Sequence, residues 1–343
     1  MIYISSFLIF FLLIYFLKKT SNYFNLIDKP SERKIHRGKI PLIGGIAIYI
    51  NLLIYSYFYE LNYHLSVIIY TSSILLILGA IDDSIELGVT FRLIAQLISC
   101  LVIIGSGLII TNIGNYMYFP KIEIGLLSVA FTVLCVIGLT NAFNFMDGID
   151  GLCAGLVLIS ISSIILFSLI GNTIDLFDSY EFFIIICVSL VLFLFFNLTS
   201  FSKIFLGDSG SMTLGFLVSW FLILFSQSEN FVIHPVLTIW CVTIPVFDLI
   251  AVFIRRISRG INPFIPDRRH VHHLLLELGL NDSRTLAIIL LFSAFLNFIG
   301  FLIFIVFGPM PALLSFIICL FMYVFLMIFI SRYIYKLKNK TLY

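Results

Sequence analysis

The chain has 343 residues, of which 61% are hydrophobic and only 11% are charged, and its formal net charge is +2 at pH 7. A soluble domain needs about 25% charged residues to cover its surface, so this composition excludes an ordinary water-soluble fold. It predicts an all-α polytopic membrane protein, with one integral-membrane domain over residues 1–343 in contact with the lipid bilayer. No nucleic-acid partner is expected.

Eleven apolar segments set the expected architecture. A helix needs roughly 17–25 apolar residues to cross a bilayer, and segments near that length recur along the whole chain. The first carries Lys18 and Lys19 after its apolar run, so we expect a retained span and not a cleaved signal peptide. The segments cover approximately 2–17, 42–59, 65–81, 92–110, 125–140, 152–171, 182–197, 212–226, 236–254, 285–307 and 311–331.

The basic residues predict the orientation. With the N-terminus outside, 19 of the 20 Lys and Arg residues fall in inner segments, and only Lys121 lies in an outer one. Positive charge concentrates on the cytoplasmic side of membrane proteins, so the inner segments and the C-terminus are predicted to be cytoplasmic. The inner segments are 18–41, 82–92, 141–151, 198–211, 255–284 and the tail from Arg332.

Two adjacent acids end the third span in the stretch LGAIDDSIELG, residues 78–88. Asp82 and Asp83 would point about 100° apart on a helix, so they are not expected to share one role. Side by side at a membrane boundary they favour a neighbouring cation, which would offset their mutual repulsion. The alternative is a polar helix end that faces water.

The stretch NAFNFMDGIDG, residues 141–151, places Asn141, Asn144, Asp147 and Asp150 three residues apart. If a helix continues through this stretch, the four side chains share one face. Two amides and two carboxylates on such a stripe suit a divalent cation or the polar edge of a nucleotide. A capped loop is the alternative, because the two glycines of the stretch also allow a helix break.

A further acid, Asp208, stands in the stretch FLGDSGS, residues 205–211, just before the eighth span. Ser209, Gly210 and Ser211 are typical of a helix start with exposed backbone N–H groups, which is a natural phosphate site. The stretch lacks the GxxxxGK[ST] pattern of a Walker A loop and the GxSxG pattern of a serine-hydrolase elbow.

The longest inner loop after the first contains NPFIPDRRHVHHLLLELG, residues 262–279. Two prolines precede Asp267, which is predicted to cap a short helix that ends at Gly279. Two arginines and three histidines would then crowd the positive end of that helix and form an anion site. The alternative gives the arginines a purely topological role. These basic residues are Arg268, Arg269, His270, His272 and His273.

One face of the chain thus combines carboxylates for a hard cation, basic groups for phosphate and a membrane boundary for a lipid. Oxygen ligands favour Mg²⁺, or Mn²⁺, over Zn²⁺. The simplest chemistry is phosphoryl transfer between a soluble phosphate compound and a membrane lipid. The basic stretch 28–45 either contacts an anionic head group or only carries positive-inside charge. A secondary transporter is the rival class, but its acids would lie near the bilayer midplane and its sequence would show repeats.

Together these motifs resemble the polyprenyl-phosphate N-acetylhexosamine-1-phosphate transferases, the WecA/TagO branch of the superfamily that also contains MraY. The resemblance runs in the family's order from residue 28 to residue 279. It implies an Mg-dependent glycosyl-1-phosphate transferase of the bacterial inner membrane, with its active site on the cytoplasmic face. The implied reaction moves N-acetylhexosamine 1-phosphate, with UDP-GlcNAc as the expected donor, to undecaprenyl phosphate and releases UMP. Such a reaction is the first membrane step of a cell-surface polysaccharide, such as O-antigen or teichoic acid.

The resemblance also implies residue roles. Asp82 and Asp83 match the acidic pair that acts on the lipid phosphate, and Asp208 and Asn144 match residues at the metal. Glu86 stands where the family often has a third aspartate. The residues that match donor-binding positions are Asp147, Asp150, Phe205 (stacking on uracil), Arg268, Arg269, His270, His272 and His273.

Three points stay open at this stage. The lipid phosphate attacks the β-phosphorus of the donor directly, or an aspartyl-phosphate forms first. The donor could be UDP-GlcNAc, UDP-GalNAc or UDP-FucNAc, and a phospho-MurNAc-pentapeptide transferase is an alternative function within the same superfamily. The oligomeric state is open between a monomer and a homodimer.

Overall fold

A computed structural model describes residues 2–28, 38–117, 119–170, 177–227, 232–258, 260 and 269–340. Residues 29–37 of the basic stretch 28–45 lie outside these ranges. Within them, the regular structure is helical apart from a hairpin of two short strands, β1 (Ile27–Asp28) and β2 (Ile40–Pro41). The helices are α1 (Ile2–Thr20), α2 (Gly44–Phe58), α3 (Tyr63–Ile85), α4 (Val89–Gly105), η1 (Gly125–Leu127), α5 (Ser128–Phe145), α6 (Leu152–Ile170), α7 (Phe177–Leu198), α8 (Asp208–Ser226), α9 (Pro235–Cys241), α10 (Thr243–Ile257), α11 (Val271–Glu277), α12 (Asp282–Phe307) and α13 (Pro309–Lys340).

Eight helices in the described part of the chain are long and apolar enough to cross a membrane, and α9 with α10 could form a ninth, broken span. The apolar helices α2 and α4 have only 15 and 17 residues. At 1.5 Å per residue they extend about 22–26 Å, less than the roughly 30 Å hydrocarbon core. Each of the eleven predicted segments contains a helix, although the segment 92–110 extends past the end of α4 at Gly105, and the all-α polytopic architecture is confirmed. The count of eleven spans and the orientation stay predictions.

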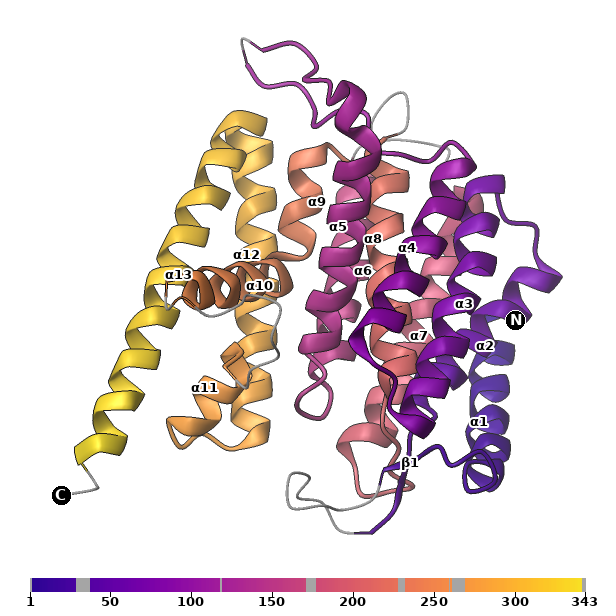
Figure 1. The fold of residues 1–343 in the computed structure, drawn as a ribbon. Helices are drawn as coiled ribbons and strands as arrows, with labels where there is room; N and C mark the ends of the chain where they lie inside the picture. The colour runs from indigo at the N-terminus through magenta and orange to yellow at the C-terminus, as the bar shows by residue number, and fades with distance from the viewer. Residues whose placement is uncertain are drawn as a thin grey trace.

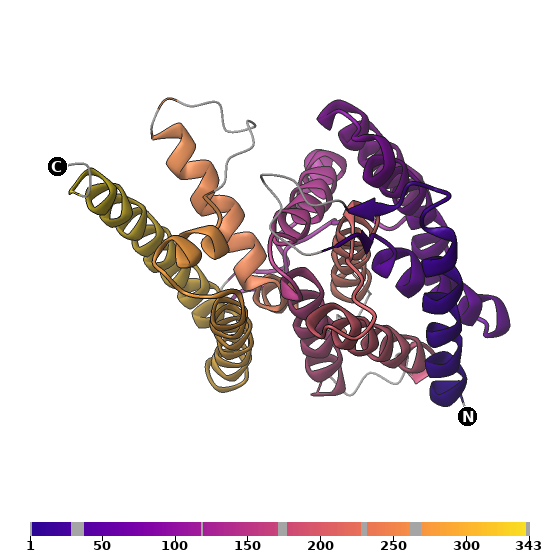
Figure 2. The same cartoon turned by 90° about the horizontal axis from the view of Figure 1, so that it is seen from below.

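Helix α8 forms the centre of the bundle, with α2, α3, α5 and α6 around it (Figure 1, Figure 2). Of its most apolar 18 residues, 94% are buried inside the protein. A Cβ on Gly79 of α3 would lie 2.4 Å from Cα of Ser209, and one on Gly215 would lie 2.9 Å from Cβ of Phe143 of α5. Small residues at such contacts let membrane helices approach closely. This close packing brings the ends of α3 and α5 to the first turn of α8.

The predicted span 236–254 is not one straight helix. Helices α9 and α10 meet at Val242 with a change of direction of 80°, and α10 lies across the bundle in Figure 1. Side chains bond the backbone groups near the break: Asn297 donates to the carbonyl of Cys241 at 3.2 Å, and the hydroxyl of Thr243 donates to the carbonyl of Trp240 at 2.7 Å. Irregular backbone at membrane depth is tolerated only where protein groups satisfy it. The break lets α10 reach α11 and α13.

The segment that precedes α8 is held by the chain that follows β2. Leu42 forms a parallel bridge with Phe205. The backbone N–H of Gly44 donates to the carbonyl of Phe205 at 2.9 Å, and the N–H of Gly45 donates to the carbonyl of Leu206 at 3.0 Å. These bonds fix the backbone just ahead of the first residue of α8.

Candidate active site

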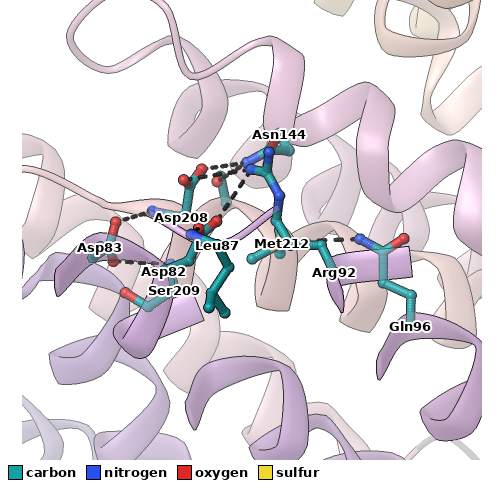
Figure 3. Close-up of polar contacts among 10 residues, drawn as sticks. Asp82, Asp83, Leu87, Arg92, Gln96, Asn144, Asp208, Ser209 and Met212 are labelled. Carbon is teal, nitrogen blue, oxygen red and sulfur yellow. Dashed lines mark hydrogen bonds and ion pairs between the residues drawn. The ribbon is translucent and has the colours of Figure 1, made fainter. Parts of the chain in front are cut away.

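Polar side chains from four helices gather in one group, which we call the acidic cluster (Figure 3). They come from α3, α4, α5 and α8, and all lie in segments that the basic residues predict to be cytoplasmic. The sequence predicted all but the arginine as site residues, and the structure brings them together. The members of the acidic cluster are Asp82, Asp83, Arg92, Asn144 and Asp208.

Asp83 binds the start of α8. Its carboxylate accepts the backbone N–H of Asp208 at 2.7 Å and that of Ser209 at 3.1 Å. Gly207 before them has φ +77°, and a Cβ there would lie 2.5 Å from Oδ2 of Asp83, so the position requires glycine. A carboxylate at a helix N-terminus satisfies free N–H groups and the positive end of the dipole. The prediction of a phosphate at these N–H groups is therefore wrong, because Asp83 is the anion there.

Arg92 lies between two carboxylates. Its Nη1 atom is 3.1 Å from Oδ2 of Asp82 and 3.7 Å from Oδ2 of Asp208. Asp82 is 4% exposed, and its other oxygen accepts the backbone N–H of Leu87. One guanidinium thus offsets the charge of two acids and is the neighbouring cation that adjacent acids favour. Sequence reasoning counted Arg92 only as inner-face charge, because a single basic residue in the next helix carries no local signal.

Asn144 orients Asp208. Its Nδ2 atom donates to Oδ1 of Asp208 at 2.7 Å and to the hydroxyl of Ser211 at 2.8 Å. The side chain of Asp208 is 37% exposed, so its carboxylate stays accessible to a ligand. Asn141, expected on the same stripe, donates instead to Oε1 of Gln96 at 2.8 Å. Of the two amides in the motif, Asn144 joins the acidic cluster and Asn141 does not.

The predicted helical stripe stops before its two acids. Helix α5 ends at Phe145, and Asp147 and Asp150 lie in the turn that follows. Asp150 forms an ion pair with Lys203 at 2.6 Å, and Nζ of Lys203 lies 5.7 Å from the centroid of the Phe205 ring. The prediction that all four polar residues share one helix face is wrong. Instead, the turn joins Asp150 to the segment that precedes α8, through a lysine that the sequence did not single out.

Asp147 lies on this turn, where the surrounding protein partly removes its carboxylate from water. This burial, together with the negative charges of Asp208, Asp83 and Asp150, raises the pKa of Asp147 well above its usual range. A bound cation would relieve the repulsion among these acids. The electrostatics of the turn therefore favour a cationic ligand.

The short helix of the histidine loop starts later than predicted. Helix α11 begins at Val271 with His270 as its N-cap. The predicted cap, Asp267, and the predicted anion ligand Arg268 lie outside the described residues. Arg269 is described, and its side chain is exposed. The helix therefore begins after the arginines, and its first turn holds histidines.

Two histidines connect this loop to the turn after α5. The centroid of the His270 ring lies 5.1 Å from that of Phe145. His272 is 1% exposed, and a Cβ on Gly148 would lie 2.0 Å from its Nε2 atom. Burial and the charges of His273 and His270 lower the pKa of His272 to about 3. Within the described residues neither ring nitrogen of His272 has a hydrogen-bond partner.

The oxygen donors of the acidic cluster suit a hard cation that is bound partly through a substrate. Among the described residues, no three His, Cys, Asp or Glu side chains form a group that could hold a metal ion. Mg²⁺ usually binds one or two protein carboxylates and takes its other ligands from substrate phosphates and water. Two oxygen donors provide such a partial set. One is the accessible carboxylate of Asp208, and the other is the amide oxygen of Asn144, whose nitrogen already donates to Asp208 and Ser211. These residues therefore fit Mg²⁺ or Mn²⁺.

The chain has relatives among known proteins. The family described as glycosyl transferase family 4 matches residues 65–226, which contain the acidic cluster. The chain is 33% identical over 311 residues to the undecaprenyl-phosphate alpha-N-acetylglucosaminyl 1-phosphate transferase of Escherichia coli (strain K12), which covers 87% of this chain and 82% of that protein. The proteins of that name from Haemophilus influenzae and Yersinia pestis are 32% and 31% identical over 304 and 310 residues, covering 87% and 88% of this chain and 84% and 82% of the relatives. The predicted resemblance is confirmed, and the chain belongs to the family of the undecaprenyl-phosphate alpha-N-acetylglucosaminyl 1-phosphate transferases, within glycosyl transferase family 4.

Proposed function

We propose that this protein transfers N-acetylglucosamine 1-phosphate from UDP-GlcNAc to undecaprenyl phosphate and releases UMP, at the cytoplasmic face of the bacterial inner membrane. The observation that carries the proposal is the acidic cluster, where an arginine and an amide meet three carboxylates in a bundle of apolar helices. Such a set of side chains can bind the phosphate groups of a lipid and of a sugar nucleotide at the membrane boundary. The relatives are named for this acceptor and this sugar, so a phospho-MurNAc-pentapeptide transferase is not favoured.

Arg92 and Asp82 are assigned to the lipid phosphate. Arg92 is 26% exposed and already holds two anionic groups, so a phosphate can replace one of them at the same guanidinium. Asp82 would keep the attacking phosphate oxygen deprotonated. Asp83, predicted to share this task, contributes by holding Asp208 and the first turn of α8 in place.

The donor is assigned to the turn after α5, the segment before α8 and the histidine loop. Phe205 is half-buried and offers a ring face for uracil, with Lys203 and Asp150 beside it. His272, buried against Gly148, would hold the turn after α5 in place beside the sugar and diphosphate. These three segments would thus supply a group for each portion of a sugar nucleotide.

The chemistry is a displacement at phosphorus. An oxygen of the lipid phosphate attacks the β-phosphorus of the donor, a P–O bond forms, and the bond to the bridging oxygen breaks as UMP leaves. Mg²⁺, which Asp208 and Asn144 would hold, neutralises charge on the diphosphate when bound. The alternative route forms an aspartyl-phosphate first. Incubation with labelled donor in the absence of lipid separates the two routes, because only the second labels the protein.

Release of UMP tests the proposal. Membranes that contain the protein are given undecaprenyl phosphate and, in turn, UDP-GlcNAc, UDP-GalNAc, UDP-FucNAc and UDP-MurNAc-pentapeptide. We expect UMP release with UDP-GlcNAc that requires both the lipid and Mg²⁺. If UMP is released with UDP-MurNAc-pentapeptide and with none of the other donors, the protein belongs to the other branch of the superfamily. Uptake of a solute without any UMP release would identify a transporter.

Cysteine labelling tests the cytoplasmic placement of the site. The background is a variant that lacks the six native cysteines. A cysteine in place of the exposed Lys121 is expected to react with an impermeant thiol reagent in intact spheroplasts. A cysteine in place of the exposed Arg284 is expected to react only after the membrane is opened. The opposite pattern would place the acidic cluster on the outer face, away from a cytoplasmic sugar nucleotide.

A further inference from the structure

Asp248 of α10 is a buried acid outside the acidic cluster. It is 1% exposed, and three groups from other elements bond to its carboxylate. Nδ1 of His270 lies 2.6 Å from Oδ2, the backbone N–H of Val271 donates to Oδ1 at 2.9 Å, and the hydroxyl of Tyr323 donates to Oδ1 at 3.3 Å. A buried carboxylate is tolerated when partners satisfy it in this way. Helices α10, α11 and α13 thus meet at one side chain.

The bend between α9 and α10 puts Asp248 in this place. In the sequence it stands inside the apolar segment 236–254, where an ionisable residue is costly unless it is paired or functional. The 80° change of direction at Val242 carries it away from the axis of α9 and to the start of α11. The carboxylate reaches His270 because the span is broken.

These contacts fix the proton pattern of the His270 ring. An ionised carboxylate only accepts hydrogen bonds, so Nδ1 of His270 carries the proton in its contact with Asp248. Within the described part of the chain, no protein group bonds to Nε2 of the same ring. The ring also packs against Phe145, the neighbour of Asn144 in the acidic cluster. Nε2 is therefore left for a ligand beside the turn assigned to the donor.

We propose that Asp248 is a positioning residue for the transfer reaction, which holds His270 with Nδ1 toward the protein and Nε2 toward the sugar nucleotide. This inference rests on the proposed function of the site. Asp248 then affects the donor only through His270. The plainer interpretation is that Asp248 is a cap for α11, since its bond from Val271 alone would stabilise the start of that helix.

A double-mutant cycle separates the two interpretations. The variants are Asp248→Asn, His270→Gln and the two combined, and each is assayed for UMP release with UDP-GlcNAc and the lipid varied in turn. Asparagine keeps an acceptor for Val271, but its Nδ2 group donates toward His270 and reverses the proton pattern of the ring. We expect kcat/KM for UDP-GlcNAc to fall roughly 10- to 150-fold in each single variant. The double variant should be no worse than His270→Gln, and the KM for the lipid should stay near that of the parent.

If the losses in kcat/KM of the two single variants multiply in the double variant, or if Asp248→Asn has the kinetics of the parent, the positioning role is overturned. Asp248 would then act only as a cap for α11. If the asparagine variant does not fold, Tyr323→Phe is the second probe, because it removes one bond and keeps the carboxylate. Tyr323→Phe should lower kcat/KM for UDP-GlcNAc less than Asp248→Asn does, and it should have no further effect in the His270→Gln background. A further loss of kcat/KM in that background would overturn the proposal.

Thr243→Val on the same helix is the matched control. It removes buried bonds of the hydroxyl to Trp240 and Asn297 without touching His270. Any effect it has should multiply with that of His270→Gln. A parent protein that releases no UMP would overturn the proposed function itself, whereas an active parent with independent losses overturns only the role of Asp248.

Discussion

Replacement of Arg92 by glutamine tests whether the acidic cluster handles the lipid phosphate. Glutamine keeps a polar end but removes the positive charge. In the parent, Nη1 of Arg92 is 3.1 Å from Oδ2 of Asp82 and 3.7 Å from Oδ2 of Asp208, so the change leaves two carboxylates without their shared cation. Asp82 is affected most, because it is 4% exposed and a buried acid without a partner is destabilising.

The expected size follows from the geometry. The 3.1 Å contact is an ion pair without hydrogen-bond geometry, and because one partner is buried we take about 1.5–3 kcal/mol, between the values for exposed and for fully buried pairs. The 3.7 Å contact is longer than a hydrogen bond and adds little. Because Arg92 is 26% exposed, water screens the pair, and the loss of folding stability should lie near the lower end, about 1.5 kcal/mol. If the lipid phosphate makes the same kind of contact, kcat/KM for undecaprenyl phosphate should fall by about 10- to 150-fold.

Initial rates of UMP release, with the lipid varied at saturating UDP-GlcNAc, measure this effect beside thermal unfolding in detergent. Arg92→Lys keeps the charge but loses the planar fork, so it should lose less activity than the glutamine variant. Arg284→Gln changes an exposed arginine in another segment predicted to be cytoplasmic and should behave like the parent. Parent-like kinetics for the lipid in Arg92→Gln, or an equal loss in Arg284→Gln, would refute the assignment.

Three further predictions concern the metal, the histidine loop and pH. Asp208→Asn should abolish UMP release while the protein stays folded, since the accessible carboxylate is lost; near-normal turnover at low Mg²⁺ would remove this residue from the metal site. Gly148→Ala would place a Cβ 2.0 Å from Nε2 of His272 and should lower kcat/KM for UDP-GlcNAc by about tenfold or more, whereas Gly105→Ala, with no atom within 4 Å, should not. His272, whose pKa of about 3 lies below its ordinary 6.5, takes up a proton on unfolding, so its contribution to stability is complete above pH 6.5 and is lost as pH falls toward 3. Thermal unfolding between those pH values should therefore depend less steeply on pH in His272→Gln than in the parent, and identical slopes would show that His272 is not buried in its neutral form.

Some of the site could be predicted from the sequence because the signals are local. Asp82 and Asp208 each stand at the end of an apolar run or beside glycines, and the structure places both in the acidic cluster. The residue at which a helix ends inside a polar stretch is harder to predict from the sequence. Helix α5 ends at Phe145 because the glycine-rich turn begins there, so the predicted stripe that would have included Asp150 does not form.

The amino-acid sequence by itself determined the membrane class, the helical segments and the acids and histidines between them, since the length and polarity of a run are properties of one segment. Only the tertiary structure decided the partners. Arg92 becomes the shared cation of two acids because α3, α4 and α8 meet there, and Asp248 reaches His270 because α9 and α10 bend by 80°. Two helices form an ion pair only if their packing brings both side chains to the same depth in the bundle and turns them toward each other. Close contacts such as that of Gly79 with Ser209 set this geometry, and they are formed by residues distant in the chain.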